Sequence, residues 1–135
     1  MFLLDTNVVS ELRKAKPHGG VLAWVADQDS SVLFVSAMTV GEIQLGIEKT
    51  RKQDAPKARQ LEVQLEYVLA TGQVLPLDAA VCRAWAQLMH RRTGALLQDA
   101  FIAATASVHR LTIATRNVRD FRALGSALIN PFDFR

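Results

Sequence analysis

The chain has 135 residues, of which 50% are hydrophobic and 21% are charged, a balance typical of a globular protein with a sizeable core. No apolar run reaches the ~20 residues of a membrane span, and the first residues lack the pattern of a signal peptide. The only cysteine, Cys82, excludes an internal disulfide, so we expect a cytoplasmic protein with no membrane partner. The net charge of +3 would suit a basic surface around an acidic pocket, although ordinary solubility is the simpler explanation.

Short apolar segments alternate with helical patterns along the chain. In order, we expect a strand at 2–4, a helix from about residue 8, a short helix at 21–25, a strand at 31–36, a helix at 39–52, a second helix of the same hairpin ending near 72, a strand at 74–77, a helix after 78, a helix within 95–106, and strands at 111–115 and 127–129. In the hairpin, Leu65 and Leu69 are expected to face inward.

This alternation predicts an α/β fold with a parallel central sheet of about five strands and helices on both faces. There is no repeat and no long linker, so residues 1–135 are expected to form one domain. Ligands of such folds bind beyond the carboxyl ends of the strands. Asp5 follows the first strand and Asp120 follows the fourth. The two acids should therefore reach the same edge of the sheet.

Asp99 is unusual because it is the only formally charged residue between Gly94 and Val108. The surrounding segment is helix-forming and apolar on almost every face, which is typical of a buried helix. A favourable position near the helix N-terminus is worth roughly 0.3–1 kcal/mol, whereas burying an ion costs several kcal/mol. We therefore expect a metal ion or another cationic partner for Asp99.

Asp5 and Glu42 each have a structural explanation as well as a functional one. Asp5 could cap the first helix, although Thr6 or Asn7 could do so equally well. Glu42 lies three residues after Thr39, the spacing of a capping box in which the glutamate reaches back to the first amide of the helix. Glu42 would still follow the second strand, at the same edge of the sheet as Asp5.

Asp120 could form a surface salt bridge or cap a loop. Three arginines flank it: Arg116, Arg119 and Arg122. Thr115 and Asn117 precede it and could orient a ligand through hydrogen bonds.

Several carboxylates in one pocket raise one another's pKa, and a divalent cation relieves the repulsion. With oxygen ligands near phosphates, Mg²⁺ or Mn²⁺ is the usual ion. The three histidines, His18, His90 and His109, are scattered and lack the spacing of a zinc site. The sequence also lacks a Walker A loop and a Gly-x-Ser-x-Gly motif.

Four segments in this order resemble the PIN domain, and the likeness covers essentially the whole chain. They are residues 1–7, the helix with Glu42, residues 99–106 and residues 115–121. The tail at 128–132 resembles the VapC/FitB branch, the toxins of type II toxin–antitoxin pairs. The resemblance implies a toxin that is a Mg²⁺- or Mn²⁺-dependent endoribonuclease.

The resemblance also implies residue roles. Four residues match the acidic, catalytic positions of the family: Asp5, Glu42, Asp99 and Asp120. Four match its supporting polar positions: Thr6, Asn7, Thr115 and Asn117. Asp5 and Asp99 are expected to be the primary metal ligands, while Glu42 and Asp120 complete a second position or act through water.

The implied partners are an RNA substrate, a cognate antitoxin that inserts a C-terminal segment into the acidic groove, and a second copy of the toxin in a homodimer. DNA would be contacted only through the antitoxin. The candidate RNA-backbone contacts are basic residues of the hairpin and of the loop 116–122: Arg51, Lys52, Lys57, Arg59, Arg116, Arg119 and Arg122. An alternative is a catalytically weak PIN domain that acts with its antitoxin on DNA as a regulatory module. A receiver domain is disfavoured because it needs a pair of acids after the first strand and a lysine after the last, where this chain has Asn130. A haloacid-dehalogenase-type phosphatase is disfavoured because Asn7 stands where its Asp-x-Asp motif needs the second acid.

Overall fold

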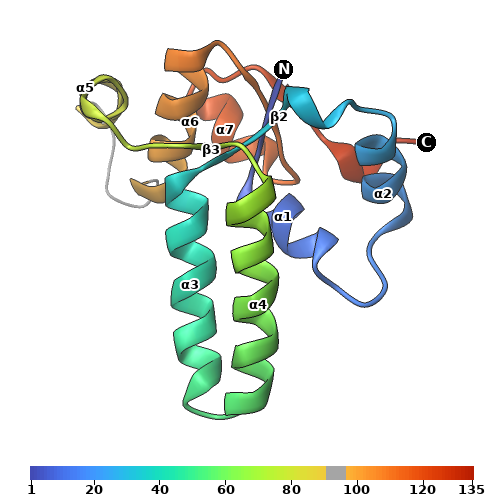
Figure 1. The fold of residues 1–135 in the computed structure, drawn as a ribbon. Coiled ribbons are helices and arrows are strands. Elements are labelled where there is room, and N and C mark those ends of the chain that lie inside the picture. The colour runs from blue at the N-terminus through green and yellow to red at the C-terminus, as the bar shows by residue number, and fades with distance from the viewer. Residues whose placement is uncertain (91–96) are drawn as a thin grey trace.

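The computed structural model describes residues 1–90 and 97–135 (Figure 1). The strands are β1 (Phe2–Leu4), β2 (Leu33–Ser36), β3 (Val74–Leu75), β4 (Thr112–Ala114) and β5 (Leu128–Ile129). The helices are α1 (Thr6–Leu12), α2 (Gly19–Ala26), α3 (Ala37–Arg51), α4 (Ala55–Thr71), α5 (Ala79–Met89), α6 (Leu97–His109) and α7 (Val118–Ala123), with short 3₁₀ helices η1 (Ser30–Val32) and η3 (Pro131–Asp133). No helix in these two ranges is long and apolar enough to cross a membrane.

The five strands form one parallel sheet in the order β3-β2-β1-β4-β5. β1 is central, and its Leu4 is in register with Val35 of β2 and Ala114 of β4. Because the strands run in one direction, their carboxyl ends share one edge of the sheet. The predicted α/β class and the five-stranded parallel sheet are confirmed.

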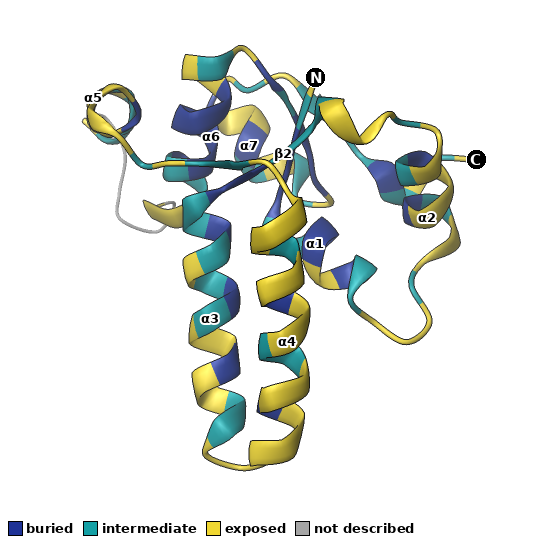
Figure 2. Ribbon diagram, viewed as in Figure 1, coloured by how far each residue is buried: buried dark blue, intermediate teal, exposed yellow. Residues whose placement is uncertain are grey.

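Helices cover both faces of the sheet, as predicted. Successive side chains of a strand point to opposite faces, so Leu3 and Leu4 belong to different cores. Leu4 packs in a core built with α1, α2, α3 and α4, whereas Leu3 packs with α6 and α7. The buried residues of α3 and α4 lie mainly where these two helices pack against each other, and the rest of α4 is largely exposed (Figure 2).

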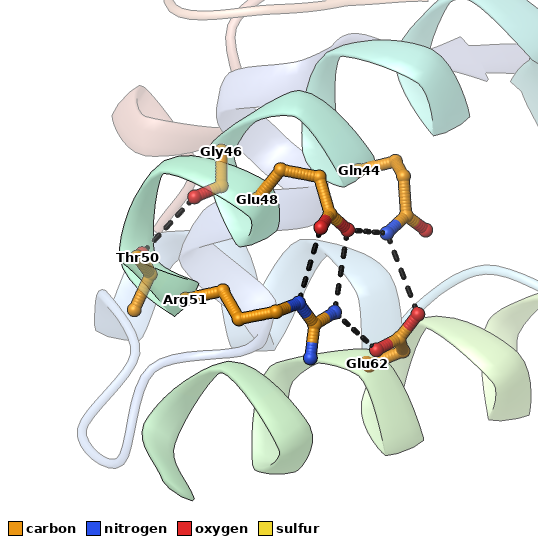
Figure 3. Close-up of polar contacts among 6 residues, drawn as sticks. All are labelled: Gln44, Gly46, Glu48, Thr50, Arg51 and Glu62. Atoms are coloured by element: carbon orange, nitrogen blue, oxygen red, sulfur yellow. Dashed lines mark hydrogen bonds and ion pairs between the residues drawn. The ribbon is translucent and has the colours of Figure 1, made fainter. Parts of the chain in front are cut away.

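α3 and α4 form the predicted hairpin, which extends away from the sheet (Figure 1). Near its tip, Arg51 forms ion pairs with Glu48 and Glu62, and Gln44 donates to both carboxylates (Figure 3). The charge of Arg51 is therefore already compensated by carboxylates of the hairpin. The prediction that Leu69 faces inward is wrong, because its side chain lies on the outer face of α4 and is 46% exposed.

Several boundaries differ from the sequence prediction, and in α1 and η1 a side chain caps the helix earlier than expected. α1 begins at Thr6, directly after β1, rather than near residue 8. The residues expected to start the second strand form η1 instead. Asp29 caps η1 by accepting from the backbone amide of Ser31 at 2.9 Å. The expected loop at 116–122 contains α7. Of the expected buried helix at 95–106, residues 95 and 96 lie outside the described residues, and α6 covers the remainder.

Candidate active site

The topology places all four candidate acids toward the carboxyl edge of the sheet. Asp5 directly follows β1, and Glu42 lies in the second turn of α3, which follows β2. Asp99 lies in the first turn of α6, and Asp120 lies in the first turn of α7 after β4. The acids therefore come from four separate elements that converge on one edge.

Asp5 is both a helix cap and the most buried of these acids, with 4% of its surface exposed. Its Oδ1 accepts from the amide of Thr6 at 2.7 Å, and its Oδ2 accepts from Asn7 Nδ2 at 2.9 Å and from Thr115 Oγ1 at 2.7 Å. Burial raises the pKa of Asp5, and these three hydrogen bonds offset only part of that rise. Since a carboxylate offers about four acceptor positions, about one remains available to a ligand.

Glu42 does not form the predicted capping box. Ser36 caps α3, with its Oγ accepting from the amide of Met38 at 3.1 Å, so Thr39 and Glu42 lie inside the helix. The Thr6 hydroxyl lies 3.0 Å from Thr39 Oγ1 and 3.2 Å from Glu42 Oε1. Glu42 therefore faces α1 and the other acids instead of its own helix terminus.

Asp99 and Asp120 share a donor. Asn117 Nδ2 donates to Asp99 Oδ2 at 3.2 Å and to Asp120 Oδ2 at 3.1 Å. The backbone amide of Asn117 in turn donates to Thr115 Oγ1 at 2.8 Å. Among the described ion pairs none includes Asp120, so the alternative of a surface salt bridge with a flanking arginine is not observed. Asp99 is half-buried rather than enclosed, because it lies at the exposed N-terminal end of α6.

The four acids act on one another electrostatically. Burial, then the charges of Asp5 and Asp120, raise the pKa of Asp99 to about 6. Burial is also the main cause of the raised pKa of Glu42, to which the charges of Asp5 and Asp99 add and which the Thr6 hydrogen bond opposes. In the folded protein Asp99 and Glu42 consequently hold their protons more tightly than free carboxylic acids do.

The four supporting polar residues belong to the same network. Besides its bond to Asp5, Asn7 donates from Nδ2 to Thr115 Oγ1 at 3.3 Å and accepts at Oδ1 from the backbone amide of Arg116 at 3.2 Å. Two further hydroxyls were not predicted: Thr39, and Thr105, whose buried Oγ1 lies 3.5 Å from Ser36 Oγ. Thr105 is the one polar residue in the apolar run 100–106 of α6, and that was the signal in the sequence that could have identified it.

The three arginines around Asp120 are exposed. The guanidinium of Arg116 lies 3.9 Å above the ring of Phe132, which holds it against the C-terminal segment. Arg119 and Arg122 lie on α7.

A divalent cation fits this donor set. In residues 1–90 and 97–135, no three acidic, histidine or cysteine side chains are close enough to form a ready-made metal centre. The carboxylates are nevertheless coupled, since the charge of Asp5 raises the pKa of both Glu42 and Asp99. Mutual repulsion of this kind is relieved by a cation, and hard carboxylate and hydroxyl oxygens are the ligands that Mg²⁺ and Mn²⁺ prefer.

The fold and the site together define a parallel α/β protein with four coupled carboxylates at one sheet edge. The family model described as PIN domain matches residues 2–126. The chain is 40% identical to "VapC ribonuclease Y4jK" of Sinorhizobium fredii and 36% identical to "Toxin FitB" of Neisseria gonorrhoeae, in each case over 98% of this chain and 99% of the relative. This chain belongs to the PIN-domain family.

Solved structures agree with this assignment. The crystal structure of FitAcB from Neisseria gonorrhoeae superposes with a TM-score of 0.86 at 35% identity, covering 99% of this chain and 100% of that one. The structure of FitAB bound to an IR36 DNA fragment gives a TM-score of 0.83 at 34% identity, covering 100% and 98%. The likeness extends over the whole length of both chains, as the sequence resemblance predicts.

Proposed function

We propose that this protein is the toxin of a type II toxin–antitoxin system and acts as a metal-dependent endoribonuclease. Its similarity to a VapC ribonuclease and to the toxin FitB supports the assignment. The observation that carries it is the mutual electrostatic coupling of the acids, seen in the raised pKa of Asp99. Such an arrangement destabilises the folded protein unless a cation is bound, which favours a functional site over a structural one.

Asp5 and Asp99 would be the primary ligands of Mg²⁺ or Mn²⁺, with Glu42 and Asp120 as direct or water-mediated ligands. When bound, the ion would supply electrophilic stabilisation of the phosphate and help to activate the attacking water. The catalytic role of each acid is to present an oxygen in its ionised form. Below pH 6, Asp99 loses much of this capacity because its pKa is about 6.

The supporting polar residues would hold the acids in place. Thr115 and Asn7 fix Oδ2 of Asp5, and Thr6 holds Glu42 toward the site. Asn117 maintains the spacing between the remaining two acids by donating to both. These donors are neutral, so they orient the carboxylates without cancelling the negative charge that attracts a cation.

The proposed partners are RNA as substrate, a cognate antitoxin and a second copy of the chain, in a cytoplasmic, single-domain protein covering residues 1–135. A basic side chain of the antitoxin facing the acids would form a strong charge-assisted clamp. Contact with DNA would be indirect, and the solved relative FitAB bound to a DNA fragment supports such an assembly. A catalytically weak regulatory module is not favoured, because all four acids are present and coupled.

The proposal is tested by incubating purified protein with RNA in Mg²⁺ or Mn²⁺ and in EDTA. Cleavage should occur only with the ion. Asp5→Asn and Asp99→Asn should abolish cleavage and growth inhibition, while the matched control Asp27→Asn, an exposed aspartate after α2, should retain both. Full activity in either site variant would contradict the assignment.

A further inference from the structure

A groove adjoins the candidate active site, between α1 and the α3–α4 hairpin, with a volume of about 660 Å³. Thr6 and Glu42 of the site form part of its lining. From Glu42, the groove follows α3 along a stripe spaced four residues apart, through Gly46 to Thr50, and Lys57 of α4 also lines it. Eight residues of helix rise about 12 Å, so the groove suits an extended chain better than a single small ligand.

Only some of the positive charges that line this groove are neutralised by a carboxylate in an ion pair. Lys14 is paired with Glu11 at 2.9 Å, but the Lys57 side chain forms no ion pair with any residue in the described ranges. Arg13 has no carboxylate partner among those ion pairs either. Glu42 is the only acid among the described residues that line the groove.

Arg13 is held in a position that favours an anion. Its Nη2 donates to the carbonyl of Leu61 at 3.2 Å, while its Nε is buried without a hydrogen-bond partner among the described residues. Burial lowers the pKa of Arg13, because the guanidinium loses water without gaining a carboxylate. An anion entering the groove would supply the missing negative charge.

We infer that this groove binds the phosphate backbone of the RNA strand and leads it to Glu42 and Thr6, with Lys57 and Arg13 as the phosphate contacts. The inference rests on the proposed function and specifies which surface guides its substrate. Polar side chains along the groove can bind phosphate or ribose without reading sequence: Ser10, Thr50, Gln60 and Gln64. The contact between Arg116 and Phe132 makes that arginine a weaker candidate.

The first test is binding of a fluorescent, unstructured RNA oligonucleotide in EDTA, measured by anisotropy at several salt concentrations. Lys57→Gln removes a groove charge, and Lys49→Gln removes an exposed charge of the same hairpin that does not line the groove. Loss of one phosphate contact should lower the slope of log K against log salt by about 0.7, which corresponds to about fivefold weaker binding at 0.1 M salt. Lys49→Gln should bind as the unaltered protein does.

The second test introduces a negative charge without removing any contact. A Cβ at Gly46 would meet no atom within 4 Å, so α3 accommodates a side chain there. Gly46→Glu should raise KM several-fold with little change in kcat, whereas Gly46→Gln, which has nearly the same size, should have a smaller effect. Thermal melting of all variants checks that they are folded.

Equal binding by Lys57→Gln and Lys49→Gln, or equal KM for the two Gly46 variants, would overturn the groove assignment. If the unaltered protein still cleaves RNA and Asp5→Asn does not, the proposed function would survive that result. If the unaltered protein does not cleave RNA, the function fails, and binding in EDTA still decides the role of the groove. Loss of antitoxin binding in Lys57→Gln with unchanged RNA binding would assign the groove to the antitoxin and refute the inference.

Discussion

Replacing Asp99 by asparagine should remove an electrostatic penalty from the folded protein at neutral pH. The pKa of this carboxyl rises from its ordinary 3.8 to about 6 on folding, through burial and the charges of Asp5 and Asp120. Asparagine keeps an oxygen that can accept from Asn117 but carries no charge. Asp99→Asn is therefore expected to fold at least as stably as the unaltered protein in the absence of metal.

The size of this gain in stability follows from the shift in the pKa of Asp99. If the whole shift of about two pKa units acted on stability, it would lower the unfolding free energy by about 3 kcal/mol at neutral pH. Because Asp99 is only half-buried and water screens its charge, the electrostatic penalty is about 1 kcal/mol. Loss of a favourable position in the first turn of α6 offsets roughly 0.3–1 kcal/mol of it. The expected gain in unfolding free energy lies between zero and about 0.7 kcal/mol, or up to about 3 °C in Tm.

The protonation of Asp99 makes the unfolding free energy depend on pH in a definite direction. Between pH 3.8 and about 6 the folded protein binds the proton of Asp99 more tightly than the unfolded chain does. The unfolding free energy therefore falls as pH rises through this window, and the penalty is fully present above it. In Asp99→Asn this part of the pH dependence should disappear, whereas Asp27→Asn should retain it.

The assay is a series of thermal melts in EDTA and in Mn²⁺. At an ion concentration ten times its Kd, the unaltered protein should gain about 1.4 kcal/mol, or about 5 °C, and Asp99→Asn should gain little. A large loss of stability in Asp99→Asn in EDTA would show that the carboxylate is structural. An unchanged response to Mn²⁺ would show that Asp99 is not a ligand.

Three further predictions concern activity and packing. With Mg²⁺ below saturation, cleavage should fall about tenfold per pH unit below the pKa of Asp99, near pH 6, and a flat profile from pH 5 to 7 would contradict this. Asn117→Ala removes the donor shared by Asp99 and Asp120, so kcat/KM should fall about 10- to 100-fold with the pH profile shifted upward, while the melting temperature changes little. Gly20→Ala places a Cβ 2.9 Å from the carbonyl oxygen of Phe134 and should destabilise the fold by about 1–3 kcal/mol in denaturant titrations; unchanged stability would mean that the C-terminal segment moves freely.

Elements with strong local signals were predictable from the sequence. Asp78 caps α5 by accepting from the amide of Val81 at 3.0 Å, as expected for an aspartate before an apolar helical pattern. Asp5 and Asp99 were identified because acids next to buried segments are costly without a partner. The alternation of apolar strands with helices also fixed the fold class, since only a parallel sheet covered on both faces buries such strands.

Glu42 shows where local reasoning fails. Two hydroxyl residues near the start of α3 could each have capped it, and Thr39 had the better sequence spacing. Ser36 caps the helix because β2 ends there, which leaves Glu42 one turn deeper and beside Thr6 of another helix. That choice depends on where the strand pairs in the sheet, a contact between distant segments.

The sequence by itself determined the class of fold, the four acids and the family, because local periodicity, charge in apolar segments and ordered motifs are all properties of the chain. Only the tertiary structure decided how the acids act together. It places Asn117 where it donates to both Asp99 and Asp120. It also brings Thr115 within hydrogen-bond distance of Asp5, 110 residues away along the chain. It also pairs Arg51 within the hairpin while leaving Lys57 without an ion pair among the described residues, and such compensation depends on distances that sequence spacing does not contain.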